Sequence, residues 1–117
     1  MGIVYEATDP ALGRNIALKT IALSLAVRDE EVELFEQRFF AEARIAARLS
    51  HPGIVVVHDV GRDPQTGTLY IAMERLRGRT LKQVIQEDAP LDQRRAIDFT
   101  CQVLIAAGFA HKRGVVH

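Results

Sequence analysis

Apolar and polar residues alternate along four short segments in the first part of the chain. A period of two is typical of a β-strand with one buried face. Turn-forming residues, mainly Asp, Pro and Gly, lie between the first two segments and between the last two. The sequence therefore predicts two β-hairpins, with strands over residues 2–7, 15–21, 54–60 and 69–74 and turns over 9–13 and 62–67.

A helical period replaces this alternation between the two hairpins. Residues 30–49 are predicted to form one helix, because Phe35, Phe39, Ala46 and Leu49 recur at the spacing of a single buried stripe. A proline shortly afterwards ends the helix, since proline disfavours the helical conformation in the residue before it. The first part of the chain is therefore expected to be an antiparallel sheet with one helix against it.

Two charged residues lie where the pattern predicts apolar surface. Glu42 falls within the helical stripe, and Lys19 shares a strand face with Ala17 and Ile21. A buried charge left unpaired costs roughly 3–5 kcal/mol. We therefore expect Lys19 and Glu42 to form an ion pair between strand and helix. The residues alone leave two interpretations open: a structural ion pair, or an ammonium group oriented for an anionic ligand.

The pattern changes from strands to helices near Gly78, which is the predicted boundary between two lobes. Thr80-Leu81-Lys82-Gln83 has the form of a capping box and predicts a helix over residues 80–87. A longer helix is predicted over residues 92–113, where one face carries Ile97, Cys101, Leu104, Ile105 and Gly108. Residues 22–28, before the first helix, fit either a loop or a short helical turn.

The composition fits one globular domain or part of one. The chain has 117 residues, 48% of them hydrophobic, with 15 Lys and Arg against 15 Asp and Glu. This balance gives no electrostatic case for binding nucleic acid or a membrane surface. No apolar run approaches the roughly 20 residues of a membrane span. The histidines lack the spacing of a metal site, Cys101 is interpreted as a small buried hydrophobe, and no P-loop motif is present.

Six short stretches follow one another along the chain. They are Gly2-Ile3-Val4-Tyr5, Ile16-Ala17-Leu18-Lys19, Glu42-Ala43, His51-Pro52-Gly53-Ile54-Val55, Tyr70-Ile71-Ala72-Met73-Glu74 and Ala110-His111-Lys112-Arg113-Gly114-Val115-Val116-His117. In this order they resemble six parts of a bacterial eukaryotic-type (Hanks-type) Ser/Thr protein kinase. Those parts are the end of the glycine-rich loop, the V-A-I-K strand, the helix glutamate, the turn after that helix, the strand before the hinge and the approach to the catalytic loop.

The resemblance implies a fold and an activity. The fold is α+β and protein-kinase-like, with residues 1–77 as an N-lobe lacking its first strand and residues 78–117 as the start of a helical C-lobe. The activity is ATP- and Mg²⁺-dependent phosphoryl transfer to Ser or Thr of a protein substrate, in the cytoplasm. By the same comparison the chain is cut at both ends. The catalytic aspartate and the metal ligands would follow His117, so the chain alone is expected to be inactive and to hold no metal ligand.

The resemblance also implies roles at the phosphates of ATP. Lys19 would contact the α- and β-phosphates, and Glu42 would hold Lys19 in place. Gly2 would let the backbone approach the phosphates, because glycine has no side chain. Without the family, a glycine before a strand is usually only part of a turn.

Further roles are implied at the adenine ring. Val4 and Ala17 would sandwich the ring, Met73 would lie at the back of the pocket, and the backbones of Glu74 and Leu76 would form hydrogen bonds with it. Ordinary strand packing is the alternative reading of the apolar residues among these.

One position departs from the family pattern, and one alternative function stays open. Arg75 lies in the hinge, where the family often has an aromatic or aliphatic residue, and we expect it to alter the fit of the nucleotide. The alternative is a pseudokinase or truncated regulatory module that binds partners without phosphoryl transfer. An aspartate two positions after His117 is required for the kinase and not for the module.

Overall fold

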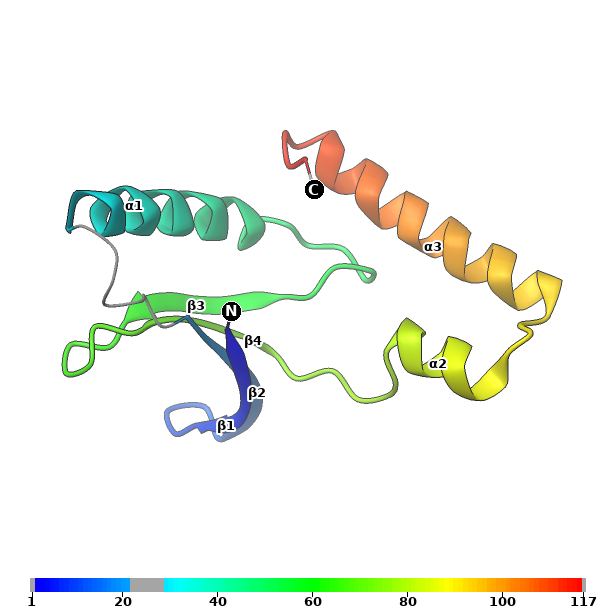
Figure 1. The fold of residues 1–117 in the computed structure, drawn as a ribbon, viewed down its shortest axis with the longest axis horizontal. Coiled ribbons are helices and arrows are strands. Elements are labelled where there is room, and N and C mark those ends of the chain that lie inside the picture. Colours follow the sequence, from blue (N-terminus) through cyan, green and yellow to red (C-terminus); the bar gives the residue numbers. More distant parts are fainter. Residues whose placement is uncertain (1, 22–28, 117) are drawn as a thin grey trace. The chain divides into compact units, whose positions relative to one another are not determined.

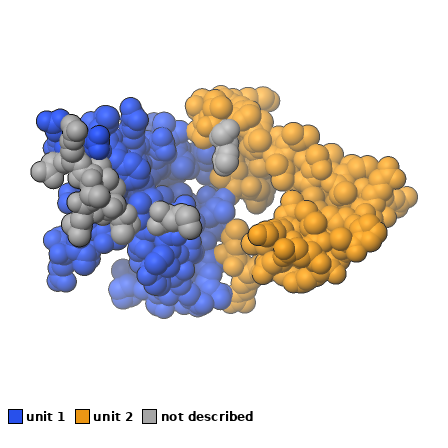
Figure 2. Space-filling model, viewed as in Figure 1, with its two compact units in different colours: residues 1–50, 55–75 blue, residues 51–54, 76–117 orange. Residues whose placement is uncertain are grey.

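A computed structural model describes residues 2–21 and 29–116 of the chain. The elements, in chain order, are β1 (Ile3–Asp9), β2 (Arg14–Ile21), α1 (Asp29–Ala46), β3 (Val57–Arg62), β4 (Leu69–Glu74), α2 (Leu81–Asp88) and α3 (Gln93–His111) (Figure 1). They fall into two compact units, which comprise residues 1–50 with 55–75 and residues 51–54 with 76–117 (Figure 2).

The first unit is built on a four-stranded antiparallel sheet in the order β1-β2-β4-β3. The two predicted hairpins, β1–β2 and β3–β4, are therefore confirmed. Local turn chemistry closes both of them. Asp9 accepts hydrogen bonds from the backbone N–H groups of Ala11 and Leu12, and Asp63 does the same for Gln65. Each turn ends in a glycine with positive φ, at Gly13 and Gly67.

The core of the first unit lies between α1 and the sheet. Leu69 on β4 is completely buried, with 0% of its surface exposed, and Phe39 and Ala43 are the buried residues of α1. Figure 1 shows α1 running alongside β3, and the two elements are in contact. The position of α1 is therefore set by packing against the sheet rather than by helix propensity alone.

The predicted inward stripe of α1 is partly wrong. Phe35 is 43% exposed and Glu42 is exposed, whereas Glu36 and Ala43 face inward. The helix also ends at Ala46 rather than at residue 49. Glu36, Phe39 and Ala43 also recur at helical spacing, and this repeat is the one that faces inward.

The later strand boundaries also differ from the sequence pattern. β3 begins at Val57 and not at residue 54, because residues 51–54 form a turn in which the Ile54 N–H donates to the carbonyl of His51. Pro52 and Gly53 favour that turn over a strand. The alternatives for residues 22–28 lie outside the described residues.

The second unit contains α2 and α3, and their ends follow the sequence signals. Thr80 and Gln83 form the predicted capping box at the start of α2. Asp92 caps α3 by accepting from the Arg95 N–H, and Gly114 beyond its end has a φ of 79°. Cys101, which was interpreted as a small buried hydrophobe, is exposed, so that prediction is wrong. Ile97, Leu104 and Ile105 on the same face of α3 are exposed as well.

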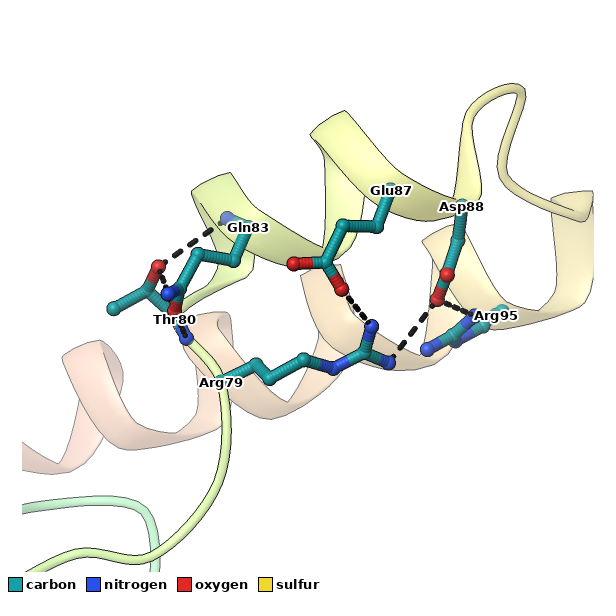
Figure 3. Close-up of polar contacts among 6 residues, drawn as sticks. All are labelled: Arg79, Thr80, Gln83, Glu87, Asp88 and Arg95. Carbon is teal, nitrogen blue, oxygen red and sulfur yellow. Dashed lines mark hydrogen bonds and ion pairs between the residues drawn. The ribbon is translucent and has the colours of Figure 1, made fainter.

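Charged side chains tie the residue before the α2 N-cap to the end of α2, and the end of α2 to α3 (Figure 3). Arg79 binds Glu87 and, at 3.3 Å, Asp88, and Arg95 of α3 binds Asp88 at 2.8 Å. The hydrogen bond from Arg95, followed by that from Arg79, lowers the pKa of Asp88 below its usual value of 3.8. Asp88 is therefore the shared acceptor of the two arginines.

This arrangement predicts a pH-dependent contribution of Asp88 to stability. A lowered pKa in the folded state means that the contribution is present above the unfolded pKa of 3.8 and is lost as pH falls through the folded pKa. We expect the thermal midpoint of Asp88→Asn, followed by far-UV circular dichroism, to lie below that of the wild type near neutral pH. The two midpoints should approach each other as the pH falls below 3.8 and through the lowered pKa of folded Asp88. A difference that does not change with pH would contradict the assignment.

Gly108 offers a second test of the same unit. It lies inside α3, and a Cβ built there meets no atom within 4 Å. Gly108→Ala is expected to raise the free energy of unfolding by about 0.5–1 kcal/mol, because alanine loses less backbone entropy in a helix. Urea denaturation measures this change. Gly61→Ala is the contrast, since its Cβ would overlap the Tyr70 ring, and an equal gain from both substitutions would contradict the packing described.

Candidate functional site

The strand register brings four of the predicted site residues to one face of the sheet. Val4 on β1 lies opposite Lys19 on β2, and Ala17 on β2 lies opposite Met73 on β4. Directly opposed residues project from the same face, and Ala17 and Lys19 share a face because they are two residues apart. Three apolar side chains and one ammonium therefore gather on a surface formed by three strands.

Gly2 lies beside this surface. A Cβ at residue 2 would stand 2.6 Å from the carbonyl oxygen of Thr20 and 3.4 Å from Cε of Lys19. The first distance is too short for a side chain, so the sheet itself requires glycine here. The second distance shows that the Lys19 side chain passes next to the Gly2 backbone.

The predicted ion pair between Lys19 and Glu42 is not formed. Both residues are exposed, and among the ion pairs of the described residues none joins them. The ion pair was predicted on the assumption that both charges are buried. Because both side chains are exposed to water, neither charge needs a partner. Lys19 and Glu42 are therefore two separate candidate site residues and not an ion pair.

α1 is instead tied to the sheet by a carboxylate that the sequence analysis missed. Glu36, whose side chain is 16% exposed, lies 3.1 Å from Nη1 of Arg62 at the end of β3. The sequence contains one signal for the inward position of Glu36. It lies three residues before Phe39 and seven before Ala43, a spacing that places all three on the same face of a helix.

Glu74 was predicted to offer a backbone hydrogen bond to adenine, and it also holds the backbone of Val56 in place. Its Oε1 accepts a hydrogen bond of 2.8 Å from the Val56 N–H, and its own N–H donates to the Val56 carbonyl at 2.9 Å. The Glu74 N–H is therefore engaged within the first unit. Leu76 is exposed and belongs to the second unit.

Arg75, the residue that departs from the family pattern, has a partner on β1. Its Nε lies 3.0 Å from Oε1 of Glu6, and both side chains are partly exposed. Glu6 is opposite Ala17 in the β1–β2 register, so its side chain projects from the same face as Ala17. Arg75 thus connects the segment after β4 to the edge of the candidate site.

The site has the chemistry for an aromatic ring joined to an anion. Val4, Ala17 and Met73 offer apolar contact, while Lys19 offers a positive charge and Gly2 leaves the backbone uncovered. No group of three or more His, Cys, Asp or Glu side chains within residues 2–21 and 29–116 is arranged to hold a metal ion. Within the same residues, no helix is long and apolar enough to cross a membrane.

Comparison with known proteins gives consistent results across the whole chain. The model of the protein kinase domain matches residues 1–117. A probable serine/threonine-protein kinase of Clostridium acetobutylicum is 39% identical over 115 residues, which cover 98% of this chain and 17% of that protein. The serine/threonine-protein kinase PknA of Mycobacterium tuberculosis is 40% identical over 120 residues, covering 100% of this chain and 27% of PknA.

Solved structures agree with the sequence relatives. The kinase domain of M. tuberculosis PknI is 35% identical and superposes with a TM-score of 0.81, over 100% of this chain and 45% of that domain. The chain therefore spans less than half of the PknI kinase domain and between 17% and 27% of these curated relatives. These matches confirm the predicted fold class and the resemblance. The chain belongs to the protein kinase family, among the bacterial Ser/Thr protein kinases.

Proposed function

We propose that this chain forms the ATP-binding part of a Ser/Thr protein kinase, which as a whole protein transfers the γ-phosphoryl group of ATP to a hydroxyl of a protein substrate. The observation that carries the proposal is the shared sheet face of Val4, Ala17, Lys19 and Met73. An apolar surface with one ammonium at its side matches a nucleotide, which has a flat aromatic base and several negative charges.

Lys19 is assigned to the α- and β-phosphates, where a positive charge offsets the negative charge of the triphosphate. Gly2 lies next to Lys19. It is assigned to the approach of the phosphate oxygens to the backbone because it carries no side chain. Val4 and Ala17 project from the same face of the sheet, so both are assigned to one face of the adenine ring rather than to a sandwich around it, and Met73 is assigned to the back of the pocket. Glu42 is assigned to Lys19, which requires α1 to move from the arrangement described above.

Hydrogen bonds to the edge of the adenine are assigned to the backbones of Glu74 and Leu76. Because the Glu74 N–H donates to Val56, its carbonyl is the group assigned here. The lobes are assigned as residues 1–77 and 78–117. ATP as co-substrate and an unpaired Cys101 support a cytoplasmic location.

The 117 residues contain neither a His-Arg-Asp nor an Asp-Phe-Gly sequence. In kinases these motifs supply the catalytic base and a ligand for the Mg²⁺ that bridges the phosphates. Phosphoryl transfer would therefore need residues beyond these, and the chain on its own is expected to bind ATP without transferring phosphate. The protein substrate would be recognised by the whole protein.

The experiment is to place residues 1–117 in the corresponding part of the PknI kinase domain and to measure phosphorylation of a generic Ser/Thr protein substrate. The proposal predicts transfer of phosphate from ATP to Ser or Thr. A folded chimera that leaves the substrate unmodified would overturn it. Unmodified PknI and a chimera whose catalytic aspartate is replaced by asparagine serve as positive and negative controls.

A regulatory module without transfer is the second candidate, and it is favoured because no ion pair among the described residues joins Lys19 to Glu42. The two candidates differ in the residues encoded after His117. Sequencing the gene there decides between them, because an aspartate two positions on supports the kinase and its replacement supports the module.

A further inference from the structure

β1 is the outer strand of the sheet, and within the described residues β2 is the one strand that pairs with it. Ile3, Val4 and Tyr5 are exposed, so little packing holds the beginning of β1 in place. An edge strand of this kind opens more easily than an interior strand. The proposed nucleotide site nevertheless includes β1, because Val4 belongs to the site and Gly2 lies beside it.

The ion pair of Glu6 with Arg75 gives β1 a second attachment. Nε of Arg75 lies 3.0 Å from Oε1 of Glu6, and the two side chains are 34% and 59% exposed. Of the ion pairs found in residues 2–21 and 29–116, it is the one that connects β1 to a segment beyond β2. The pair of Asp9 with Arg14 stays within the β1–β2 hairpin. Because two strand spacings separate β1 from β4, Glu6 and Arg75 together bridge roughly 10 Å across β2.

The strand register places this ion pair at the candidate site. Glu6 is opposite Ala17, and Ala17 is opposite Met73, so the three residues form one row on the face of the site. Arg75 follows Met73 by two residues and binds the carboxylate at the other end of the row. Val4 is two residues from Glu6 on the same strand face, so a restraint on Glu6 also restrains Val4.

We propose that the Glu6–Arg75 pair positions β1 for the nucleotide by tying it, across β2, to the segment that follows β4. Both are positioning residues, because they act on the bound nucleotide only through Val4 and Gly2. A site that is already ordered binds its ligand more tightly, since less conformational freedom is lost on binding. The effect on ATP rests on the proposed function, whereas the restraint on β1 does not depend on it.

The restraint belongs to this chain rather than to the kinase fold in general. Arg75 lies in the hinge, where the family often has an aromatic or aliphatic residue, and such a residue has no charge to offer Glu6. An ion pair that is partly exposed contributes modestly and is weakened by salt. We therefore expect changes of about two- to fivefold when the pair is broken, and not a loss of binding.

The first measurement is amide hydrogen exchange of the purified 117-residue chain without nucleotide, followed by NMR in a buffer of low ionic strength. Glu6→Gln and Arg75→Gln should each speed exchange in β1 by about two- to fivefold, because the strand opens more often without its second attachment. Exchange in β3 and β4 should not change. Equal exchange of β1 in the wild type and in both variants would overturn the proposal.

Double variants distinguish a broken ion pair from general loosening of the sheet. E6Q/R75Q should exchange no faster than either single variant, because the two groups act together. E6R/R75E restores a pair of the opposite sense and should return exchange toward the wild-type rate. All differences should shrink in about 1 M salt, where the screening length is about 3 Å. Additive effects in E6Q/R75Q would show that the two side chains act independently, against the proposal.

Arg77→Gln is the matched control. It removes another exposed arginine, two residues after Arg75, and the ion pairs of the described part of the chain do not include it. Exchange in β1 should be the same as in the wild type. An increase equal to that of Arg75→Gln would mean that loss of any nearby positive charge is enough.

ATP affinity is the second measurement, by NMR titration of the same variants. Both single variants should bind ATP about two- to fivefold more weakly, with recovery in E6R/R75E. Glu6→Gln is the decisive variant, because it removes a negative charge near the site. Electrostatics alone would then tighten the binding of an anion, whereas loss of the restraint weakens it. Unchanged or tighter binding of ATP by Glu6→Gln would overturn the positioning role.

The two measurements also separate this inference from the proposed function. If the folded wild type does not bind ATP but exchange in β1 responds as expected, the proposed function fails and the restraint on β1 stands. If ATP binds at the sheet face but neither exchange nor affinity responds to Glu6 and Arg75, the proposed function stands and the inference fails. Circular dichroism of each variant confirms that the fold is retained before the comparison.

Discussion

Lys19→Met is expected to lower phosphoryl transfer by the PknI chimera by about a hundredfold or more, the usual effect of removing one charged or hydrogen-bonding group from a site of developing charge. The exposed Lys19 side chain contributes little to packing, so the fold should remain intact. Methionine keeps the length of the side chain and removes the charge. The measurement is kcat/KM for ATP at fixed protein substrate.

Lys82→Met is the matched control, because Lys82 is also exposed but lies on α2 in the second unit. It should leave kcat/KM within about twofold of the unsubstituted chimera, as surface substitutions usually do. Lys19→Arg is informative as well, since a guanidinium keeps the charge but differs in shape from an ammonium. Equal losses from Lys19→Met and Lys82→Met would mean that Lys19 has no special role.

Leu69→Ala is expected to lower the free energy of unfolding of the chain by about 2–4 kcal/mol. Leu69 is completely buried in the interior strand β4, which pairs with β2 on one side and β3 on the other. Removing its side chain loses the transfer free energy and leaves a cavity that paired strands cannot easily close. This is a large part of the stability of a small domain, so much of the variant should be unfolded at room temperature.

Urea denaturation followed by circular dichroism measures the effect, with Leu12→Ala as the matched control. Leu12 is 67% exposed in the β1–β2 turn and should change stability by no more than about 0.5 kcal/mol. If the two leucines gave the same loss, the core would not lie where the structure places it.

The strands and turns of the first unit could be predicted well because their signals are local. A period of two and the Asp and Gly residues of the turns define the hairpins without reference to the rest of the chain. β4 was predicted with its observed bounds, Leu69–Glu74. The start of α2 could be predicted in the same way, because a capping box consists of neighbouring residues.

The inward face of α1 could not be predicted fully because it depends on partners far away in the sequence. Phe35 was predicted to be a core residue, yet it is 43% exposed, and the inward position is taken by Glu36, whose side chain is 16% exposed. The cation that makes the inward position of Glu36 acceptable is Arg62, twenty-six residues later. Nothing in the local pattern around Glu36 identifies that partner.

The residues of the candidate site were predicted from the sequence. Their arrangement in space follows from the register of the paired strands, which the sequence did not show. Pattern alone placed Ala17 and Lys19 on one strand face; the pairings of Val4 with Lys19 and of Met73 with Ala17 came from the structure. The resemblance to kinases supplied the roles, and those roles stay a proposal. The predicted pairing of Lys19 with Glu42 was wrong for this arrangement of α1.

The most direct measurement is a titration of the ¹⁵N-labelled 117-residue chain with ATP, followed by the backbone amide shifts in NMR spectra. The account predicts saturable shifts that are largest at Gly2, Val4, Ala17, Lys19 and Met73, and their loss in Lys19→Met. Shifts confined to α2 and α3, or no saturable shift at millimolar ATP in a folded chain, would contradict the claim that this sheet face binds the nucleotide.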